Sequence, residues 1–207
     1  ISACLVGSEM CIRDRTGPEG SIGRMVAAGR LSSMILWGPP GTGKTTIARL
    51  LADSVGMRYA AVSAVFSGVA DLKRAFAEAE TAAKAGQKTL LFVDEIHRFN
   101  RAQQDGFLPF VERGTVTLVG ATTENPSFAL NAALLSRAQV LILERLGHEA
   151  LGELLARAEE LERPLPLTDD ARAALIASAD GDGRFLLNQA ETCLLYTSDA
   201  ADDLLCV

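Results

Sequence analysis

The middle of the chain contains short apolar runs separated by longer segments in which apolar and polar positions alternate with a helical period. Residues 34–37 and 89–93 are apolar with almost no interruption, as expected of strands that are buried on both faces of a parallel sheet. Three further strands are expected at residues 59–62, 115–121 and 139–143, the last of them also buried. Helices are predicted between the strands, at residues 46–55, 69–85, 101–112 and 131–135. This alternation predicts an α/β fold with a parallel sheet flanked by helices.

The pattern becomes purely helical after residue 146. Helices are predicted at residues 149–162, 168–178 and 184–191, with a break at Pro164-Leu165-Pro166 and with Thr168 as an N-cap. We therefore expect an α/β domain over residues 17–146 and the start of a small helical lid domain over residues 147–191.

Both ends of the chain differ from the middle. All four cysteines lie near the ends, at Cys4, Cys11, Cys193 and Cys206. Residues 9–15 can be encoded by AGATGTGTATAAGAGACAG and residues 192–198 by its reverse complement, CTGTCTCTTATACACATCT. These strings resemble the mosaic end of a transposase-based sequencing adapter. Residues 1–16 and 192–207 are therefore predicted to be non-native, adapter-like tails.

The net charge of the chain is halved without these tails. The formal net charge is −6 for the whole chain, and the tails hold two arginines and five acidic residues, which leaves −3. So small a balance neither indicates nor excludes contact with nucleic acid. No apolar run is long enough to span a bilayer, so no membrane association is expected. The cysteine-free middle has no disulfide framework, and a cytoplasmic location is predicted.

The strongest chemical signal follows the first apolar run. It reads Gly38-Pro39-Pro40-Gly41-Thr42-Gly43-Lys44-Thr45-Thr46. A strand, a glycine-rich turn and a helix in this order aim backbone N–H groups and the positive helix end at a phosphate group. Lys44 would neutralise β- and γ-phosphate oxygens, and the Thr45 hydroxyl would bind Mg²⁺. The motif predicts a site for ATP or GTP.

The second apolar run ends in Asp94-Glu95. Carboxylates at the carboxyl end of a parallel strand lie in the crevice where such sheets bind ligands. Asp94 is predicted to belong to the Mg²⁺ shell, and Glu95 to orient or deprotonate the attacking water. The structural alternatives are a helix N-cap for Asp94 and a solvated loop charge for Glu95.

Other polar residues near strand ends are weaker candidates. Thr123 or Asn125 could hydrogen-bond the γ-phosphate and its water, or could serve only a Pro-terminated turn. Arg137 is placed to serve a neighbouring subunit's nucleotide as an arginine finger, although a surface ion pair is the more common role of such a residue. Arg184 would begin a lid helix that faces the nucleotide, with a surface ion pair again as the alternative. The role of His97 stays open, and Phe99, Phe107 and Phe110 are interpreted as core contacts.

Four strings, taken in order, resemble an AAA+ ATPase, a P-loop NTPase. They begin at Trp37, Asp94, Gly120 and Leu134 and read WGPPGTGKTT, DEIHRFN, GATTENPSF and LLSR. Within that superfamily the chain is similar to the replication-associated recombination protein A family, whose eukaryotic relatives include the Werner-helicase-interacting ATPase. The likeness covers residues 17–191, and DEIHRFN and TENPSF are its most specific parts.

This resemblance implies a DNA-dependent ATPase that uses ATP and Mg²⁺ and acts in replication-fork maintenance, recombination and DNA repair. It implies a homo-oligomer associated with DNA, as single-stranded ends or forks, with single-strand DNA-binding protein and with the nucleoid. Lys44 and Thr45 match Walker A, Asp94 and Glu95 match Walker B, and Thr123 or Asn125 matches sensor 1. Arg137 matches the finger that acts in trans, and Arg184 matches sensor 2.

The chain also departs from the family pattern. It lacks the upstream segment that helps to hold adenine, it stops within the lid, and Phe185 stands where relatives often carry a second basic residue. Two alternatives therefore stay open. One is a clamp-loader subunit or branch-migration ATPase, and the other is a truncated ATP-binding fragment without turnover.

Overall fold

The structure is a computed structural model that describes the backbone of residues 21–202 and the side chains of residues 22–194. Most of the predicted adapter-like tails, with Cys4, Cys11 and Cys206, lies outside these residues. None of the helices in the described residues combines the length and the apolar character needed to cross a membrane.

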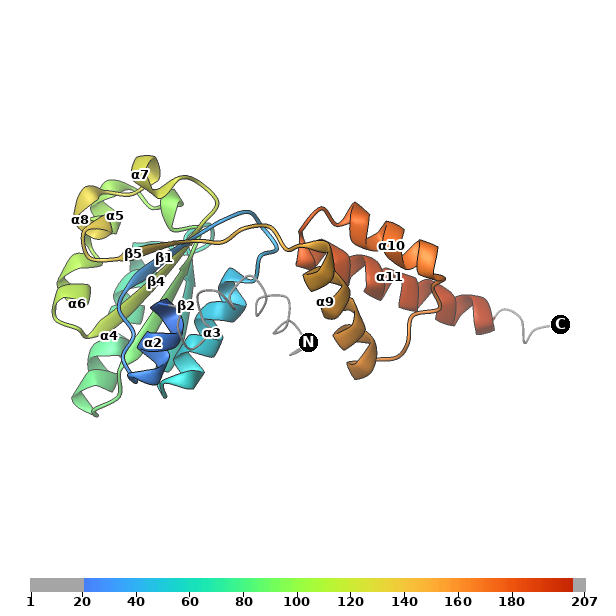
Figure 1. The fold of residues 1–207 in the computed structure, drawn as a ribbon. Coiled ribbons are helices and arrows are strands. Elements are labelled where there is room, and N and C mark those ends of the chain that lie inside the picture. Colours follow the sequence, from blue (N-terminus) through green and yellow to red (C-terminus); the bar gives the residue numbers. More distant parts are fainter. Residues whose placement is uncertain (1–20, 203–207) are drawn as a thin grey trace. The chain divides into compact units, whose positions relative to one another are not determined.

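The described part of the chain divides into two units. The first, called here the α/β unit, contains residues 21–38 and 44–143. The second, called here the helical unit, contains residues 144–202 together with the short loop 39–43. Figure 1 shows the sheet and its helices in the first unit and helices without a sheet in the second.

A five-stranded sheet forms the centre of the α/β unit, with strand order β2-β3-β4-β1-β5. The strands are β1 (Met34–Trp37), β2 (Arg58–Ser63), β3 (Thr89–Asp94), β4 (Val116–Thr122) and β5 (Gln139–Ile142). Every pairing between neighbours is parallel. The predicted α/β class and the parallel sheet are confirmed.

Helices cover both faces of this sheet (Figure 1). They are α2 (Ser21–Ala27), α3 (Lys44–Ser54), α4 (Val69–Lys84), η1 (Ile96–Arg98), α5 (Arg101–Asp105), α6 (Leu108–Glu112), α7 (Pro126–Ala129) and α8 (Ala132–Leu135). The connections β1-α3-β2 and β2-α4-β3 run in opposite directions along the sheet. Right-handed crossovers therefore place α3 and α4 on opposite faces.

One core of this unit lies on the α4 face. It joins Phe76 of α4, Phe99 and Phe107 to alternate residues of the strands, such as Leu91 and Val93. The Phe76 ring meets Phe107 edge to face, with centroids 5.5 Å apart, and stacks on Phe110 at 4.0 Å. The interpretation of the three downstream phenylalanines as core contacts is confirmed, because each such ring buries a large apolar area.

Two of the predicted elements are wrong in detail. The helix expected at residues 101–112 is two short helices, α5 and α6, with Pro109 in the first turn of α6. Proline is tolerated there because an N–H in the first turn has no partner within the helix, but it cannot continue a helix from before. The strand at 139–143 is not buried, since in β5 only Leu141 is shielded. β5 is the edge strand beside β1, so its alternate residues face solvent.

The helical unit consists of α9 (His148–Leu161), α10 (Asp169–Ser178) and α11 (Gly183–Asp202). Its separate core is made mainly of leucines from α9 and α11, among them Leu151, Leu155 and Leu186. The Thr168 side chain accepts a hydrogen bond from the Ala171 N–H, which confirms the predicted N-cap. The backbone of α11 stays helical beyond residue 191, where the second adapter-like tail is predicted to begin.

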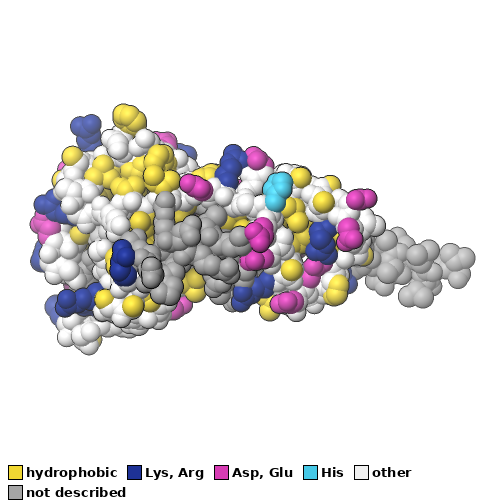
Figure 2. Space-filling view, in the orientation of Figure 1, with side chains coloured by type: hydrophobic (Ala, Val, Ile, Leu, Met, Phe, Trp, Pro, Cys, Tyr) yellow, Lys and Arg dark blue, Asp and Glu magenta, His cyan; other side chains and the backbone are white. Residues whose placement is uncertain are grey.

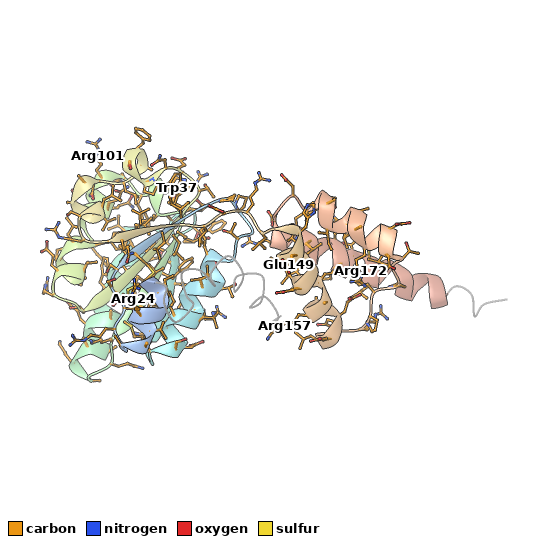
Figure 3. All side chains as sticks on the ribbon, in the orientation of Figure 1. Arg24, Trp37, Arg101, Glu149, Arg157 and Arg172 are labelled. Carbon is orange, nitrogen blue, oxygen red and sulfur yellow. The ribbon has the colours of Figure 1, made fainter. Side chains whose placement is uncertain are left out.

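An ion pair holds α10 to the end of α9. Arg172, labelled in Figure 3, donates to both carboxylate oxygens of Glu159, at 2.8 and 2.6 Å. The Leu165 N–H donates to the same carboxylate at 2.9 Å. These bonds, first of all the one from Arg172, lower the pKa of Glu159 below its ordinary value of 4.5 although burial opposes the shift.

Candidate functional site

Predicted site residues of the α/β unit lie where β1 and β3 end, at one edge of the sheet. β1 is followed by the glycine-rich turn and by Lys44, the first residue of α3, while β3 ends at Asp94. β4 lies between these strands, and its Gly120 pairs with Val93 on one side and with Ile35 on the other. Parallel strands end at the same edge of a sheet, so Lys44 and Asp94 both lie at this edge.

Lys44 stands at the amino end of α3, where the helix has its positive pole. A cation in this position is unfavourable unless an anion is bound there, so it indicates an anion site. The Lys44 Nζ donates to the Gly38 carbonyl at 2.8 Å. Gly41 and Gly43 adopt φ angles of 72° and 81°, in the left-handed region that favours glycine.

Gly38 is fixed by a close approach of two backbones. A Cβ on this residue would lie 2.3 Å from the Leu143 carbonyl oxygen, at the end of β5. The Leu143 N–H donates to the Trp37 carbonyl at 2.6 Å, which holds the two segments together. Figure 3 labels Trp37, the last residue of β1. Glycine is therefore required here by packing, before any ligand is considered.

Glu95 is held in an unusual conformation directly after β3. Its φ and ψ are 51° and 45°, in the left-handed region that a non-glycine residue rarely adopts. Its Oε2 is buried and receives no hydrogen bond from the described residues. A strained backbone and an unsatisfied carboxylate oxygen are both typical of functional sites.

The residues expected to hold Mg²⁺ offer oxygen ligands. Thr45 supplies a hydroxyl and Asp94 a carboxylate, and hard oxygen donors suit Mg²⁺, which usually takes one or two carboxylates together with phosphate oxygens and water. No group of three or more His, Cys, Asp or Glu side chains in the described residues could hold a metal by itself. This donor set fits a metal that arrives with a phosphate-bearing ligand.

The two candidates for sensor 1 are exposed in the turn that follows β4. The Asn125 side chain accepts a hydrogen bond from the Ser127 N–H at 3.0 Å and caps α7. This is the local turn role that the sequence left open as its alternative. The described contacts give neither Thr123 nor Asn125 a ligand role, so their assignment stays a prediction.

Two residues that sequence reasoning did not assign form a polar cluster beside Glu95. His97 lies in η1, with a side chain 7% exposed, and its Nδ1 is 2.9 Å from the hydroxyl of buried Thr122. The same Nδ1 is 3.3 Å from Glu95 Oε2, and Nε2 is 3.4 Å from Glu124 Oε1. In the sequence, the feature that could have identified His97 as a site residue is its position directly after the acid pair Asp94-Glu95. Nothing in the sequence distinguished Thr122 from the neighbouring threonine.

Arg137 lies after α8 and is paired within its own chain. Its Nε and Nη2 are 2.7 and 2.6 Å from Glu112 Oε1, and its Nη1 donates to the Ala133 carbonyl at 2.8 Å. This ion pair is the common alternative named for it above. A role in trans stays a prediction.

In the helical unit, loop 39–43 contacts the amino end of α11. The Gly183 N–H donates to the Gly41 carbonyl at 3.3 Å, and Asp182 Oδ1 accepts from the Phe185 N–H at 2.9 Å. A pocket of about 250 Å³ lies here. It is lined by Pro39, Pro40, Arg145, Asp182, Phe185 and residues 178–181. Phe185 lines this pocket, whereas Arg184 does not, and the sensor 2 role of Arg184 stays a prediction.

Comparisons with known proteins agree with this geometry. Residues 34–146 match the ATPase family associated with various cellular activities (AAA). Replication-associated recombination protein A of Escherichia coli K12 is 48% identical over 174 residues, which are 81% of this chain and 39% of that protein. The protein of the same name from Coxiella burnetii is 47% identical over 84% of this chain and 41% of its own length. ATPase WRNIP1 of Dictyostelium discoideum is 48% identical over 76% of this chain and 19% of its own length.

Among solved structures, the chain is similar to the RuvB Holliday junction branch migration motor of Thermotoga maritima. The TM-score is 0.65 at 27% identity, over 82% of this chain and 57% of that one. The resemblance predicted from the motifs and the fold class are confirmed. The chain spans about two fifths of the length of the bacterial relatives named above.

Proposed function

Because this chain belongs to the AAA family of ATPases, we propose that it binds ATP with Mg²⁺ at the carboxyl edge of its sheet and hydrolyses the β–γ phosphoanhydride bond. One observation carries the proposal. The phosphate loop with Lys44 and the acid pair Asp94-Glu95 follow two parallel strands that flank β4 and end at the same edge. An anion site and a pair of carboxylates at one crevice are what phosphoryl transfer to water requires.

The residues divide the chemistry among them. The backbone N–H groups at the amino end of α3 bind the β-phosphate, and Lys44 neutralises the charge on the β and γ oxygens. Thr45 and Asp94 hold Mg²⁺, which, when bound, neutralises phosphate charge in the transition state. Glu95 accepts a hydrogen bond from the attacking water and orients it or takes its proton. Thr123 or Asn125 donates to the γ-phosphate oxygens.

Two arginines complete the site in this proposal. Arg137 acts on the nucleotide of a neighbouring copy, where it stabilises the charge of the transition state, so the active form is a homo-oligomer. Arg184, at the start of α11, acts as sensor 2 on the nucleotide of its own chain. What supports both roles is the match of these positions to motifs of the AAA+ family.

The similarity to replication-associated recombination protein A supports a proposed cellular role. We infer a DNA-dependent ATPase that acts on single-stranded ends or forks in replication-fork maintenance, recombination and repair. Single-strand DNA-binding protein is its expected partner, and the nucleoid-associated cytoplasm is its expected location. The net charge of −3 without the predicted tails neither supports nor excludes this DNA contact.

The similarity to the RuvB branch migration motor supports a second candidate, an ATPase that acts on four-way junctions. A clamp-loader subunit is a related possibility. Because the chain spans about two fifths of its relatives, a third candidate is a fragment that binds ATP without turnover.

Measuring phosphate release by the purified chain separates these functions. The release is measured without DNA, with single-stranded ends, with forks, with four-way junctions and with a sliding clamp. Stimulation by ends or forks is expected. Stimulation by junctions alone or by the clamp contradicts an ATPase that acts on single-stranded ends or forks. ATP binding with no hydrolysis indicates a truncated fragment that binds ATP without turnover.

A further inference from the structure

The short helix η1 holds the His97 ring against the end of the sheet. Its neighbours Ile96 and Phe99 are buried in the core of the α/β unit, so the helix has little freedom to rotate. The His97 side chain points from this anchored turn to Thr122, the last residue of β4. The ring therefore joins the residues that follow β3 to the end of β4.

The contacts around Thr122 favour a hydrogen on Nδ1 of the imidazole. The Thr122 hydroxyl is 3.2 Å from the Glu124 carbonyl, to which it can donate, and accepts from the Glu124 N–H at 3.0 Å. When the hydroxyl donates to this carbonyl it accepts from His97, which assigns a hydrogen to Nδ1. That N–H also lies next to Glu95 Oε2, so the positive edge of the ring faces the buried carboxylate oxygen.

The Nδ1 and Nε2 edges of the His97 ring face groups that differ in exposure. The Nδ1 edge faces two shielded groups, the Thr122 hydroxyl and Glu95 Oε2. The Nε2 edge faces Glu124, whose side chain is 64% exposed and can turn into water. Only the Nδ1 edge can therefore fix a neighbour firmly, because an exposed ion pair contributes little.

Glu95 needs such support because its own backbone is strained. A non-glycine residue in the left-handed region persists only when its surroundings hold it there. The buried Ile96 side chain and the His97 ring, which directly follow it, provide that restraint.

We propose that His97 is a positioning residue whose Nδ1 edge fixes the Glu95 carboxylate and ties it to Thr122 at the end of β4. The proposal rests on the proposed function, since it assumes that Glu95 orients the attacking water. It predicts that His97 affects the rate of the chemical step and not the affinity for ATP.

Three substitutions of His97 in the full chain test whether the Nδ1 or the Nε2 edge of the ring positions Glu95. In His97→Asn the side-chain amide takes the place of Nδ1, whereas in His97→Gln it takes the place of Nε2. We expect His97→Ala and His97→Gln to lower kcat roughly 10- to 100-fold, as a displaced catalytic group does. His97→Asn should recover most of this loss, and all three should keep the KM and the Kd for ATP within about two-fold of the unaltered chain.

The kinetic outcomes separate this proposal from the proposed function. If Glu95→Gln hydrolyses ATP normally, the function assigned to Glu95 fails. If Glu95→Gln is inactive while His97→Ala has a normal kcat, only the role of His97 is refuted. Equal losses in all three His97 variants, in proportion to their loss of thermal stability, would show a merely structural role.

A second measurement does not depend on turnover. The chain has only two histidines, so ¹⁵N spectra of the imidazoles give two sets of signals, and the exposed His148 is the internal control. We expect a proton on Nδ1 of His97 and a change in its signals in Glu95→Gln, with His148 unchanged. A neutral His97 protonated on Nε2 alone, or signals that do not respond to Glu95→Gln, would overturn the proposal.

Discussion

Arg137 and Glu112 form an ion pair within one chain, with two guanidinium nitrogens 2.7 and 2.6 Å from the same carboxylate oxygen. A guanidinium held in this way is restrained at the end of α8 without being buried, since it is 39% exposed. Such a pair contributes little to stability. The Arg137–Glu112 pair can therefore break with little loss of stability, which leaves the guanidinium able to bind a phosphate group of a neighbouring copy.

The proposed trans role of Arg137 is tested by mixing subunits. Arg137→Ala should keep ATP binding but lose hydrolysis by roughly 10³-fold or more, as expected for an arginine finger. Adding Lys44→Ala subunits, which carry Arg137 but bind no ATP, should restore part of the activity. Arg113→Ala is the control, because Arg113 is another exposed arginine of the α/β unit that is paired with a glutamate, Glu80. No rescue on mixing would count against a role in trans.

Lys44→Ala should weaken ATP binding at least about 100-fold. The reason is the loss of charge-assisted contacts to the phosphates, which are worth roughly 3 kcal/mol together. Titration calorimetry with ATP measures the effect, and Lys73→Ala, an exposed lysine of α4, is the control. Equal affinity in the two variants would show that the phosphates do not bind at the start of α3.

Glu95→Gln should retain ATP and lose hydrolysis by roughly 10²- to 10⁴-fold, because the amide can accept a hydrogen bond from water but cannot take its proton. Single-turnover hydrolysis and equilibrium binding are measured on the same preparation. A normal rate would remove Glu95 from the mechanism and leave it as a strained structural residue.

Gly38→Ala should destabilise the chain by about 1–3 kcal/mol even without nucleotide, because its Cβ would collide with the Leu143 carbonyl. Gly152→Ala is the matched control. Gly152 lies inside α9, and a Cβ there meets only Ile176 at 3.8 Å, so alanine should stabilise the helix by up to about 1 kcal/mol. Denaturant unfolding measures both, and a neutral Gly38→Ala would contradict the close packing of β1 on the end of β5.

The pair Glu159–Arg172 should make the stability of the helical unit depend on pH. The pKa of Glu159 is lowered in the folded state, so its contribution is complete at neutral pH, shrinks below about 4.5 and is lost as the pH falls through the lowered pKa. Glu159→Gln should cost about 1–2 kcal/mol at neutral pH, and the difference should vanish in acid. Unfolding followed by circular dichroism at a series of pH values tests this, with the exposed Glu160→Gln as control. A difference that is independent of pH would show that packing, and not charge, makes the contribution.

Local patterns were sufficient for most of the fold. The apolar runs predicted all five strands, and the phosphate-loop string predicted a glycine-rich turn followed by a helix, which begins two residues earlier than predicted, at Lys44. Two details required more than the pattern. Pro109 divides the helix predicted at residues 101–112, and β5 is exposed because it is an edge strand. Strand order depends on pairing between distant segments, which an apolar run by itself does not specify.

The sequence by itself determined the family, the α/β class and the residue types that could bind a nucleotide, because these follow from short strings and from local periodicity. Only the tertiary structure decided that His97 meets Thr122 across 25 residues and that Arg137 is paired with Glu112. The physical reason is distance along the chain. Hydrogen bonds and ion pairs depend on a few ångströms in space, and folding alone brings residues from separate strands and helices within that range.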